Sequence, residues 1–198
     1  MQYFNTLPKT LYTNYSGGTI ILTNILARAN ILPEAFKSPL LYYTYDVQEG
    51  DTPEIVAHKY YNDPYRYWIV LFANQMIDPL WDWPLSGNNF NAYIADKYTS
   101  FNPYSTAHHY EKIIEQTDLT SNITTKNTVI IDQSTYNSFV SGTTSYTLPT
   151  GTVSIKTSTR AVDYYTYELE LNESKRNIQL LNKDYVNEFE TELKNLMR

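Results

Sequence analysis

The sequence contains no cysteine among its 198 residues, and it has only six glycines and three histidines. The absence of cysteine excludes a disulfide framework and thiolate catalysis. No apolar run approaches the ~20 residues needed to span a bilayer, and the first residues, MQYFNTLPKTLY, lack a basic start followed by an apolar stretch. We therefore expect a protein that resides in the cytosol or in an assembly, with no membrane partner.

Positive charge is also scarce. The chain has 15 lysines and arginines against 21 acidic residues, a net charge of −6, and its basic residues are scattered along the sequence. Because binding to phosphates requires a basic surface, the composition predicts no nucleic-acid partner.

Groups that could perform catalysis or bind metal are few. His58, His108 and His109 are the only histidines, and His109 with Glu111 would share one face of a strand but lacks a third ligand at a recognisable spacing. The sequence has no Gly-rich phosphate loop, no Gly-x-Ser-x-Gly and no His-Glu-x-x-His. Each acidic residue that could pair for glycoside cleavage has a cap or turn role: Asp51, Glu54, Asp63 and Asp78. We predict no enzyme, no cofactor and no metal site.

Tyrosine is abundant, with 20 copies beside 7 phenylalanines and 3 tryptophans. Tyrosine suits interfaces, where one side of the ring is packed and the hydroxyl reaches a partner, but it also fills β-strands. Both interpretations remain open for the whole chain. The adjacent pairs favour the interface interpretation: Tyr42-Tyr43, Tyr60-Tyr61 and Tyr164-Tyr165.

The segment from Tyr45 to Pro79 has the most regular pattern. A short strand is predicted first, and after a turn Thr52 and Pro53 supply the cap and the first residue of a helix. Ile55 and Val56 are expected on the buried face of this helix, together with the positions one turn later.

A second helix is predicted from Tyr65 to Ala73. Its apolar residues cover more than one stripe, so we expect Trp68 in the core, and Asn74 is expected to end the helix in the left-handed conformation. A further short helix is predicted over residues 90–98, where Phe90, Ile94 and Tyr98 recur four apart.

This βαα order resembles the LysM module, in which two helices pack on one side of a small two-stranded sheet. The usual closing strand, Gly-x-x-Leu-x-Ile-Pro, is replaced here by Asp78–Pro84, so the resemblance leaves the second strand and the glycan groove unassigned. The matching positions are Tyr45–Val47, Gly50–Thr52, Ile55–Ala57, and Asn74 with Ile77.

Residues 101–163 are rich in serine and threonine and contain no helix pattern. We expect a β-rich insertion made of hairpins, with turns at Ser141–Thr144 and Pro149–Gly151. The predicted strands are His109–Glu115, Val129–Ile131 and Val153–Lys156.

The last residues become regular again. Alternation from Tyr165 to Leu171 predicts a half-buried strand, and a turn at Asn172–Ser174 leads into a second strand over Arg176–Leu180. Asn182 is placed to cap an amphipathic helix that runs to the end of the chain, and we expect this helix to pack on the protein's own sheet rather than on a partner.

Two motifs resemble the baseplate wedge protein 53 family of contractile-tailed bacteriophages. The resemblance covers about 45–100 and 163–198 and is weak or absent between them. The first motif is Asn62–Trp68 leading into Asn74 and Asp78-Pro79, and the second is Tyr167-Glu168 with Leu171–Glu173 and Lys175-Arg176.

The resemblance implies a virion structural protein of the tail baseplate, assembled in the host cytoplasm and without catalytic activity. It implies six copies, one per wedge, that clamp neighbouring wedges and link them to central hub or tail-tube proteins. The rival hypothesis, from the LysM resemblance, is a module that binds the glycan of peptidoglycan.

The predicted fold is α+β, a LysM-like βαα module with a β-rich insertion and a C-terminal β-hairpin plus amphipathic helix. The expected divisions are an extended N-terminal arm over 1–44, where Pro33 and Pro39 prevent long helices, the module over 45–100, the insertion over 101–163, and the hairpin and helix over 164–198.

We predict that partners are bound through exposed aromatic and charged side chains. Trp81 and Trp83 are spaced by two in an extended segment, so both are expected to point the same way. The acidic residues from Glu168 to Glu173 are expected to be solvated in the free protein, with Arg176. The predicted partner-binding residues are Tyr42, Tyr43, Tyr65, Tyr67, Trp81, Trp83, Glu168, Glu173 and Arg176.

Overall fold

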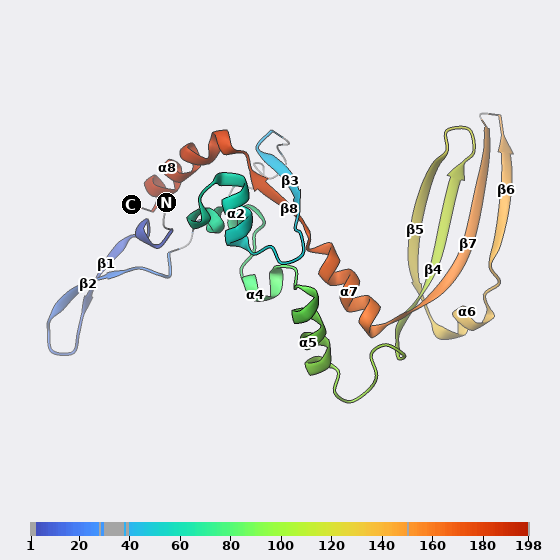
Figure 1. Ribbon diagram of the computed structural model, residues 1–198, viewed down its shortest axis with the longest axis horizontal. Helices are drawn as coiled ribbons and strands as arrows, with labels where there is room; N and C mark the ends of the chain where they lie inside the picture. Colours follow the sequence, from blue (N-terminus) through green and yellow to red (C-terminus); the bar gives the residue numbers. More distant parts are fainter. Residues whose placement is uncertain (1–2, 28, 30–37, 39, 150, 198) are drawn as a thin grey trace. The chain divides into compact units, whose positions relative to one another are not determined.

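The computed structural model describes residues 3–27, 29, 38, 40–149 and 151–197, and it has an α+β fold with open antiparallel sheets (Figure 1). The chain divides into two compact units. The first unit combines Met1–Gly87 with Glu173–Arg198, and the second unit is Asn88–Asn172. The chain therefore leaves the first unit, forms the second and returns to complete the first.

The sheet of the first unit has two strands from distant parts of the sequence. Strand β3 (Tyr42–Asp46) pairs antiparallel with β8 (Asn177–Leu181), and Tyr45 lies opposite Ile178. The second strand, which the sequence left unassigned, is therefore β8, and it follows the second unit in the sequence. The arrangement of β3, two helices and β8 is that of a βαα module with a late closing strand, and its likeness to LysM stays a prediction.

The first helix, α2 (Pro53–Tyr61), begins where it was predicted. The hydroxyl of Thr52 accepts a hydrogen bond from the backbone N–H of Ile55. Val56 is buried as predicted, but Ile55 is exposed and Ala57 is buried in its place. One residue rotates a helix by about 100°, so an error of a single position turns a neighbour outward.

The second helix consists of a 3-10 turn, η2 (Pro64–Arg66), followed by α3 (Tyr67–Ala73). Asn74 ends α3 with φ −102°, so the predicted left-handed cap is wrong, and the left-handed residue is Gln75. The side chain of Asn74 has another use. Its amide donates to the carbonyl of Gln179 and accepts from the N–H of the same residue, both at 2.8 Å, and so fastens β8 to the end of α3.

The C-terminal helix packs on the core of its own unit, and its ring contacts are to α3 rather than to the sheet that was predicted. The side chain of Asn182 caps a 3-10 turn, η3 (Lys183–Tyr185), which continues into α8 (Val186–Leu196). The ring of Trp68 is buried and stacks on Phe189 of α8 at 6.0 Å. The same core cluster contains residues from just after β3, from α2, from α3, from β8 and from α8. In chain order they include Val47, Val56, Ile69, Leu180, Val186 and Leu193.

The N-terminal segment contains a 3-10 turn, η1 (Tyr3–Asn5), and a hairpin of β1 (Lys9–Thr13) and β2 (Thr19–Thr23). Leu7 is buried in the core cluster, so this end of the chain is attached to the first unit. The expectations for Pro33 and Pro39 lie outside the described residues.

The second unit contains α5 (Gly87–Lys97), which matches the short helix predicted there, and a four-stranded antiparallel sheet in the order β5-β4-β7-β6. Three strands were predicted. The helix α6 (Gln133–Ser138) and the strand β6 (Gly142–Leu148) were not, since their serine and threonine residues are also typical of turns. The other strands are β4 (Ala107–Asp118), β5 (Ile123–Ile131) and β7 (Gly151–Asp163).

The predicted C-terminal β-hairpin is wrong in its first half, because α7 (Tyr164–Ser174) is a helix. Asp163 accepts a hydrogen bond from the N–H of Thr166 at 2.7 Å and so starts the helix. Within the unit Tyr165 packs against the ring of Phe90 at 5.6 Å. Tertiary packing of aromatic side chains therefore outweighs the alternation of the sequence, and only β8 of the predicted hairpin is a strand.

Candidate functional site

Three exposed apolar side chains lie at a short helix, α4 (Pro79–Asp82): Leu80 and Trp81 within the helix, and Ile77 two residues before it. We call these three residues the Trp81 knob. Asp78 caps the helix by accepting from the N–H of Leu80 at 3.1 Å, and Lys175 donates to the carbonyl of Trp81 at 2.5 Å. The knob is thus held by polar contacts at its base while its apolar side chains face solvent. Exposed tryptophan is a frequent anchor of protein interfaces.

Trp83 does not accompany Trp81, so the prediction that both point the same way is wrong. The exposed fraction is 56% for Trp81 and 7% for Trp83. Trp81 lies within α4, and residues two positions apart in a helix point to different sides. The indole N–H of Trp83 donates to the carbonyl of Asp51 at 2.9 Å, which gives this ring a structural role in the core.

Asp51 is the polar anchor of the turn that receives Trp83. Its carboxylate accepts from the hydroxyl of Tyr45 at 2.7 Å and from the ammonium of Lys59 at 2.6 Å. Burial pushes the pKa of Asp51 upward, but the hydrogen bonds from Lys59 and Tyr45 outweigh burial and hold the pKa below its ordinary value. The charged form therefore persists and keeps the turn closed.

The tyrosines of β3 divide between core and surface. Tyr42 is half-buried against the core, and burial raises its pKa. Tyr43 is exposed and its ring stacks on Tyr60 of α2, with centroids 5.8 Å apart and an interplanar angle of 11°. Lys183 lies 4.7 Å from the centre of the Tyr60 ring. Tyr43 and Tyr60, which we call the Tyr43 stack, present a second aromatic surface on the first unit.

The motif around η2 contributes one exposed ring. Tyr65 is exposed, whereas Tyr67 is half-buried and packs against the core. Between them, Arg66 binds the carboxylate of Glu190 on α8 at 3.1 Å. Of the two tyrosines predicted to bind partners here, only Tyr65 is largely exposed.

Arg176 and Glu173 serve the fold of the first unit. The guanidinium of Arg176 donates to Glu173 at 2.7 Å, to Glu49 at 3.2 Å and to the carbonyl of Val47 at 3.2 Å. These bonds raise the pKa of Arg176, with the hydrogen bond to Glu173 as the largest cause. Arg176 was expected to be solvated, but it fixes the chain next to the start of β8.

Glu168 was also expected to be solvated, and this is wrong because α7 turns it inward. Its carboxylate accepts from the hydroxyl of Tyr98 at 2.6 Å, from Lys97 at 2.7 Å and from the hydroxyl of Tyr93 at 3.2 Å. Burial pushes the pKa of Glu168 upward, but these hydrogen bonds hold it below its ordinary value. Burial, together with the bond to Glu168, raises the pKa of Tyr98 to about 12. Glu168 therefore joins α5 to α7 inside the second unit.

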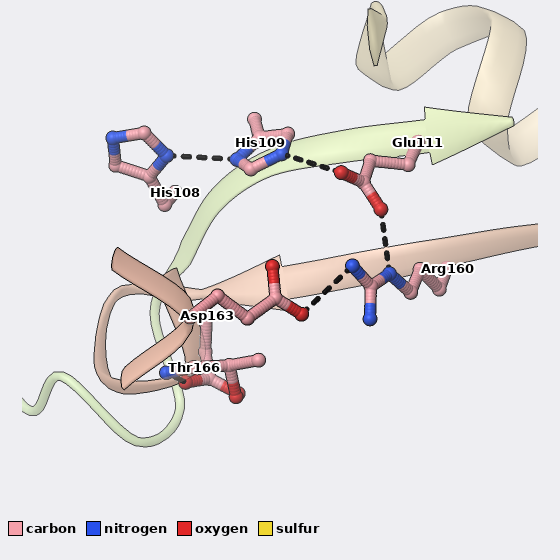
Figure 2. A network of polar contacts seen from close by, with 7 residues as sticks. His108, His109, Glu111, Arg160, Asp163 and Thr166 are labelled. Atoms are coloured by element: carbon pink, nitrogen blue, oxygen red, sulfur yellow. Dashed lines mark hydrogen bonds and ion pairs between the residues drawn. The ribbon is translucent and has the colours of Figure 1, made fainter. Parts of the chain in front are cut away.

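A polar network joins β4, β7 and α7, and Figure 2 shows it from close by. The Nδ1 atoms of His108 and His109 lie 2.8 Å apart, and His109 Nε2 lies 3.2 Å from Glu111. Arg160 binds Glu111 at 2.5 Å and Glu170 at 2.9 Å. Burial pushes the pKa of Glu111 upward, but the bonds from Arg160 and His109 lower it overall.

This network has the composition of a structural cluster. His109 and Glu111 share one face of β4, as predicted, but in the part of the chain that the structure describes no group of three or more histidine or acidic residues could hold a metal ion. The carboxylate of Glu111 is already paired with Arg160.

The hairpin of β1 and β2 is an exposed apolar feature that the sequence did not predict. Leu11 and Ile21 lie opposite each other and are exposed by 72% and 70%. A run of β-branched residues after Gly17 and Gly18 could have identified the hairpin. The N-terminal segment therefore adds a third candidate contact surface to the Trp81 knob and the Tyr43 stack.

Among the described residues, no helix is long and apolar enough to cross a membrane. A family model described as Base plate wedge protein 53 matches residues 3–198, which confirms the resemblance and extends it over the serine- and threonine-rich segment. No curated protein matches the chain.

Proposed function

The chain belongs to the base plate wedge protein 53 family, a family of phage tail baseplate proteins, and we propose that it clamps adjacent wedges and links them to the central hub. The structural role in the baseplate follows from the family. The clamping and the link to the hub are the proposal.

The observation that carries the proposal is the number of separate contact surfaces on the first unit. The Trp81 knob, the Tyr43 stack and the β1–β2 hairpin each expose aromatic or apolar side chains, and each is fixed by its own local contacts. Several surfaces on one core support contact with several subunits at once.

Other features of the chain agree with this proposal. We expect six copies, one for each wedge, assembled in the host cytoplasm with neighbouring wedge proteins and hub or tail-tube proteins as partners. The net charge of −6 disfavours contact with nucleic acid. The polar networks around Glu168 and Glu111 are engaged in ion pairs and hydrogen bonds within the chain, which supports a role without catalysis.

Binding to peptidoglycan glycan is the second candidate, and a specific observation favours it. The indole of Trp81 and the ring of Tyr43 are exposed on a βαα module closed by β8, and aromatic faces can stack on sugars. Retention of the free chain on a peptidoglycan column, with loss of retention in Trp81→Ala, would support glycan binding. Passage of the chain through the column favours a protein partner.

The clamp proposal is tested with Trp81→Ala and Tyr43→Ala, measured by recovery of the chain in purified baseplates. Both side chains are exposed, so the thermal melt of the free protein should change little. Leu196→Ala is a matched control, because Leu196 is exposed on α8 outside the three surfaces. Normal recovery of both aromatic variants would refute the assignment of these surfaces to the clamp.

A further inference from the structure

The β1–β2 hairpin exposes apolar side chains on both of its faces. Residues directly opposite each other in an antiparallel pair share a face, and successive residues alternate. Leu11 and Ile21 are paired and therefore occupy one face. Tyr12 pairs with Ile20, and together with Leu22 they occupy the other face. All five side chains are exposed, so neither face is covered by the residues that the structure describes.

The hairpin is also nearly free of charge. No charged residue occurs from Thr10 to Ala27, although the chain has 36 charged residues, 15 basic and 21 acidic. Lys9, at the base of β1, donates to the hydroxyl of Thr23 at 2.7 Å. A charged partner surface would lose hydration against this hairpin without gaining an ion pair. The complementary surface is therefore apolar and uncharged.

The loop between the strands is built to hold its shape. Asn14 donates its N–H to the carbonyl of Gly18 at 2.9 Å, and its side-chain oxygen accepts from the N–H groups of Ser16 and Gly18. Gly17 has φ +79°, which glycine adopts without strain. The ring of Tyr15 is fully exposed beside these residues. An ordered loop lowers the entropy lost when the hairpin is bound.

The base of the hairpin is tied to the folded core. Asn24 donates its N–H to the carbonyl of Pro8 at 2.8 Å, and the preceding residue, Leu7, is buried in the core cluster. Further toward the N-terminus, the ring of Tyr3 lies 5.4 Å from Trp68. A load on the hairpin is therefore transmitted to the first unit rather than to a free tail.

We infer that the β1–β2 hairpin inserts into an uncharged, apolar cleft with two walls on a neighbouring baseplate protein. A flat partner would leave one apolar face in water, whereas a cleft covers both. Strands of five residues are too short for the 9–11 residues of a membrane-spanning strand, so a protein cleft is a better complement than lipid. This inference rests on the proposed role in the baseplate.

The test compares two double variants that change one face each. Leu11→Thr with Ile21→Thr removes the apolar side chains of one face, and Ile20→Thr with Leu22→Thr removes those of the other. Threonine keeps the strand propensity, so the hairpin itself should persist. Leu11→Ile with Ile21→Val is the matched control, since it keeps the face apolar. Each variant is supplied to cells that produce all other tail proteins, and its recovery in purified baseplates is measured.

We expect each double threonine variant to lower recovery at least about tenfold and the control to stay within about twofold of the wild type. Loss in only one variant would show a flat partner and overturn the cleft. Normal recovery of both, in baseplates that still depend on Trp81, would overturn the inference and leave the proposed function intact. Absence of the wild-type chain from baseplates would instead refute the proposed function.

The free wild-type chain is examined in parallel by light scattering and by sedimentation with phosphatidylcholine vesicles. If the free chain is a monomer and does not sediment with the vesicles, the result supports a cleft on another protein as the binding site of the hairpin. Dimerisation that the threonine variants abolish would identify a second copy as the occupant, and vesicle binding that they abolish would identify lipid. Either result would overturn the inference.

Discussion

The side chain of Asn74 makes both hydrogen bonds of a strand pair with the backbone of Gln179, at 2.8 Å each. One residue at the end of α3 thus holds a strand that lies after the second unit in the sequence. Because β8 also pairs with β3, this contact joins the two chain segments of which the first unit is made.

Asn74→Ala should therefore destabilise the first unit by about 1–3 kcal/mol, since two backbone groups of β8 lose their partner. Urea unfolding measures the free-energy change. Asn74→Asp is an informative comparison, because aspartate can accept from the N–H of Gln179 but cannot donate to its carbonyl. Equal stability of wild type and Asn74→Ala would contradict this role for the amide.

The three tryptophans should separate into two classes. Trp68→Ala should destabilise the protein by about 3–5 kcal/mol because it leaves a large cavity in the core. Trp81→Ala should cost less than about 1 kcal/mol because its side chain is largely in solvent. Thermal melts of both variants provide the comparison, and similar losses would show that Trp81 belongs to the core.

Trp83→Phe isolates the hydrogen bond of the buried indole. Phenylalanine keeps most of the ring but leaves the carbonyl of Asp51 without its donor. We expect a loss of about 1–3 kcal/mol in urea unfolding. Recovery of this variant in baseplates at near-wild-type levels would agree with a core role, and loss of recovery with an unchanged melt would instead place Trp83 at an interface.

The stability of the second unit should depend on acid through Glu168 and Glu111, whose pKa values are both below the ordinary 4.5. The folded state then binds fewer protons than the unfolded state near this pH. The contribution of the two carboxylates is therefore present above the ordinary value and is lost as pH falls through the lowered values. Thermal melts between pH 7 and pH 3 measure the slope.

Glu168→Gln should flatten this acid dependence and lower stability at pH 7 by about 1–3 kcal/mol, because Lys97 and two tyrosine hydroxyls lose a charged partner. Glu170→Gln on the same helix is the control. Its carboxylate is half exposed and bonded to Arg160, so its loss should be about 0–1 kcal/mol. An unchanged acid slope in Glu168→Gln would contradict the role of this carboxylate.

Local chemistry was enough to predict some elements. Thr52 and Pro53 identify the start of α2, and Asn182 identifies the start of the C-terminal helix, because caps act within one turn. The burial of Trp68 also follows from apolar residues on more than one stripe of its helix. For the two caps, the determining contacts lie close in sequence.

The failures involve contacts between distant residues. The segment from Tyr165 to Leu171 alternates like a strand, but Asp163 starts a helix and the rings of Phe90 and Tyr165 pack together. Pairing of β3 with β8 cannot be read from either strand alone. For the candidate site, the exposure of Trp81 and the burial of Trp83 depend on a single short helix. Its start is marked by the Asp78 cap and Pro79, but four residues are too few to show a helical pattern of apolar positions.

Cross-linking mass spectrometry on purified baseplates can show whether this wedge protein clamps neighbouring wedges. We expect cross-links from each copy to subunits of two adjacent wedges, with linked sites near the Trp81 knob, the Tyr43 stack and the β1–β2 hairpin. Cross-links confined to a single wedge, with all three surfaces still accessible to solvent labelling in the assembled baseplate, would contradict the clamp.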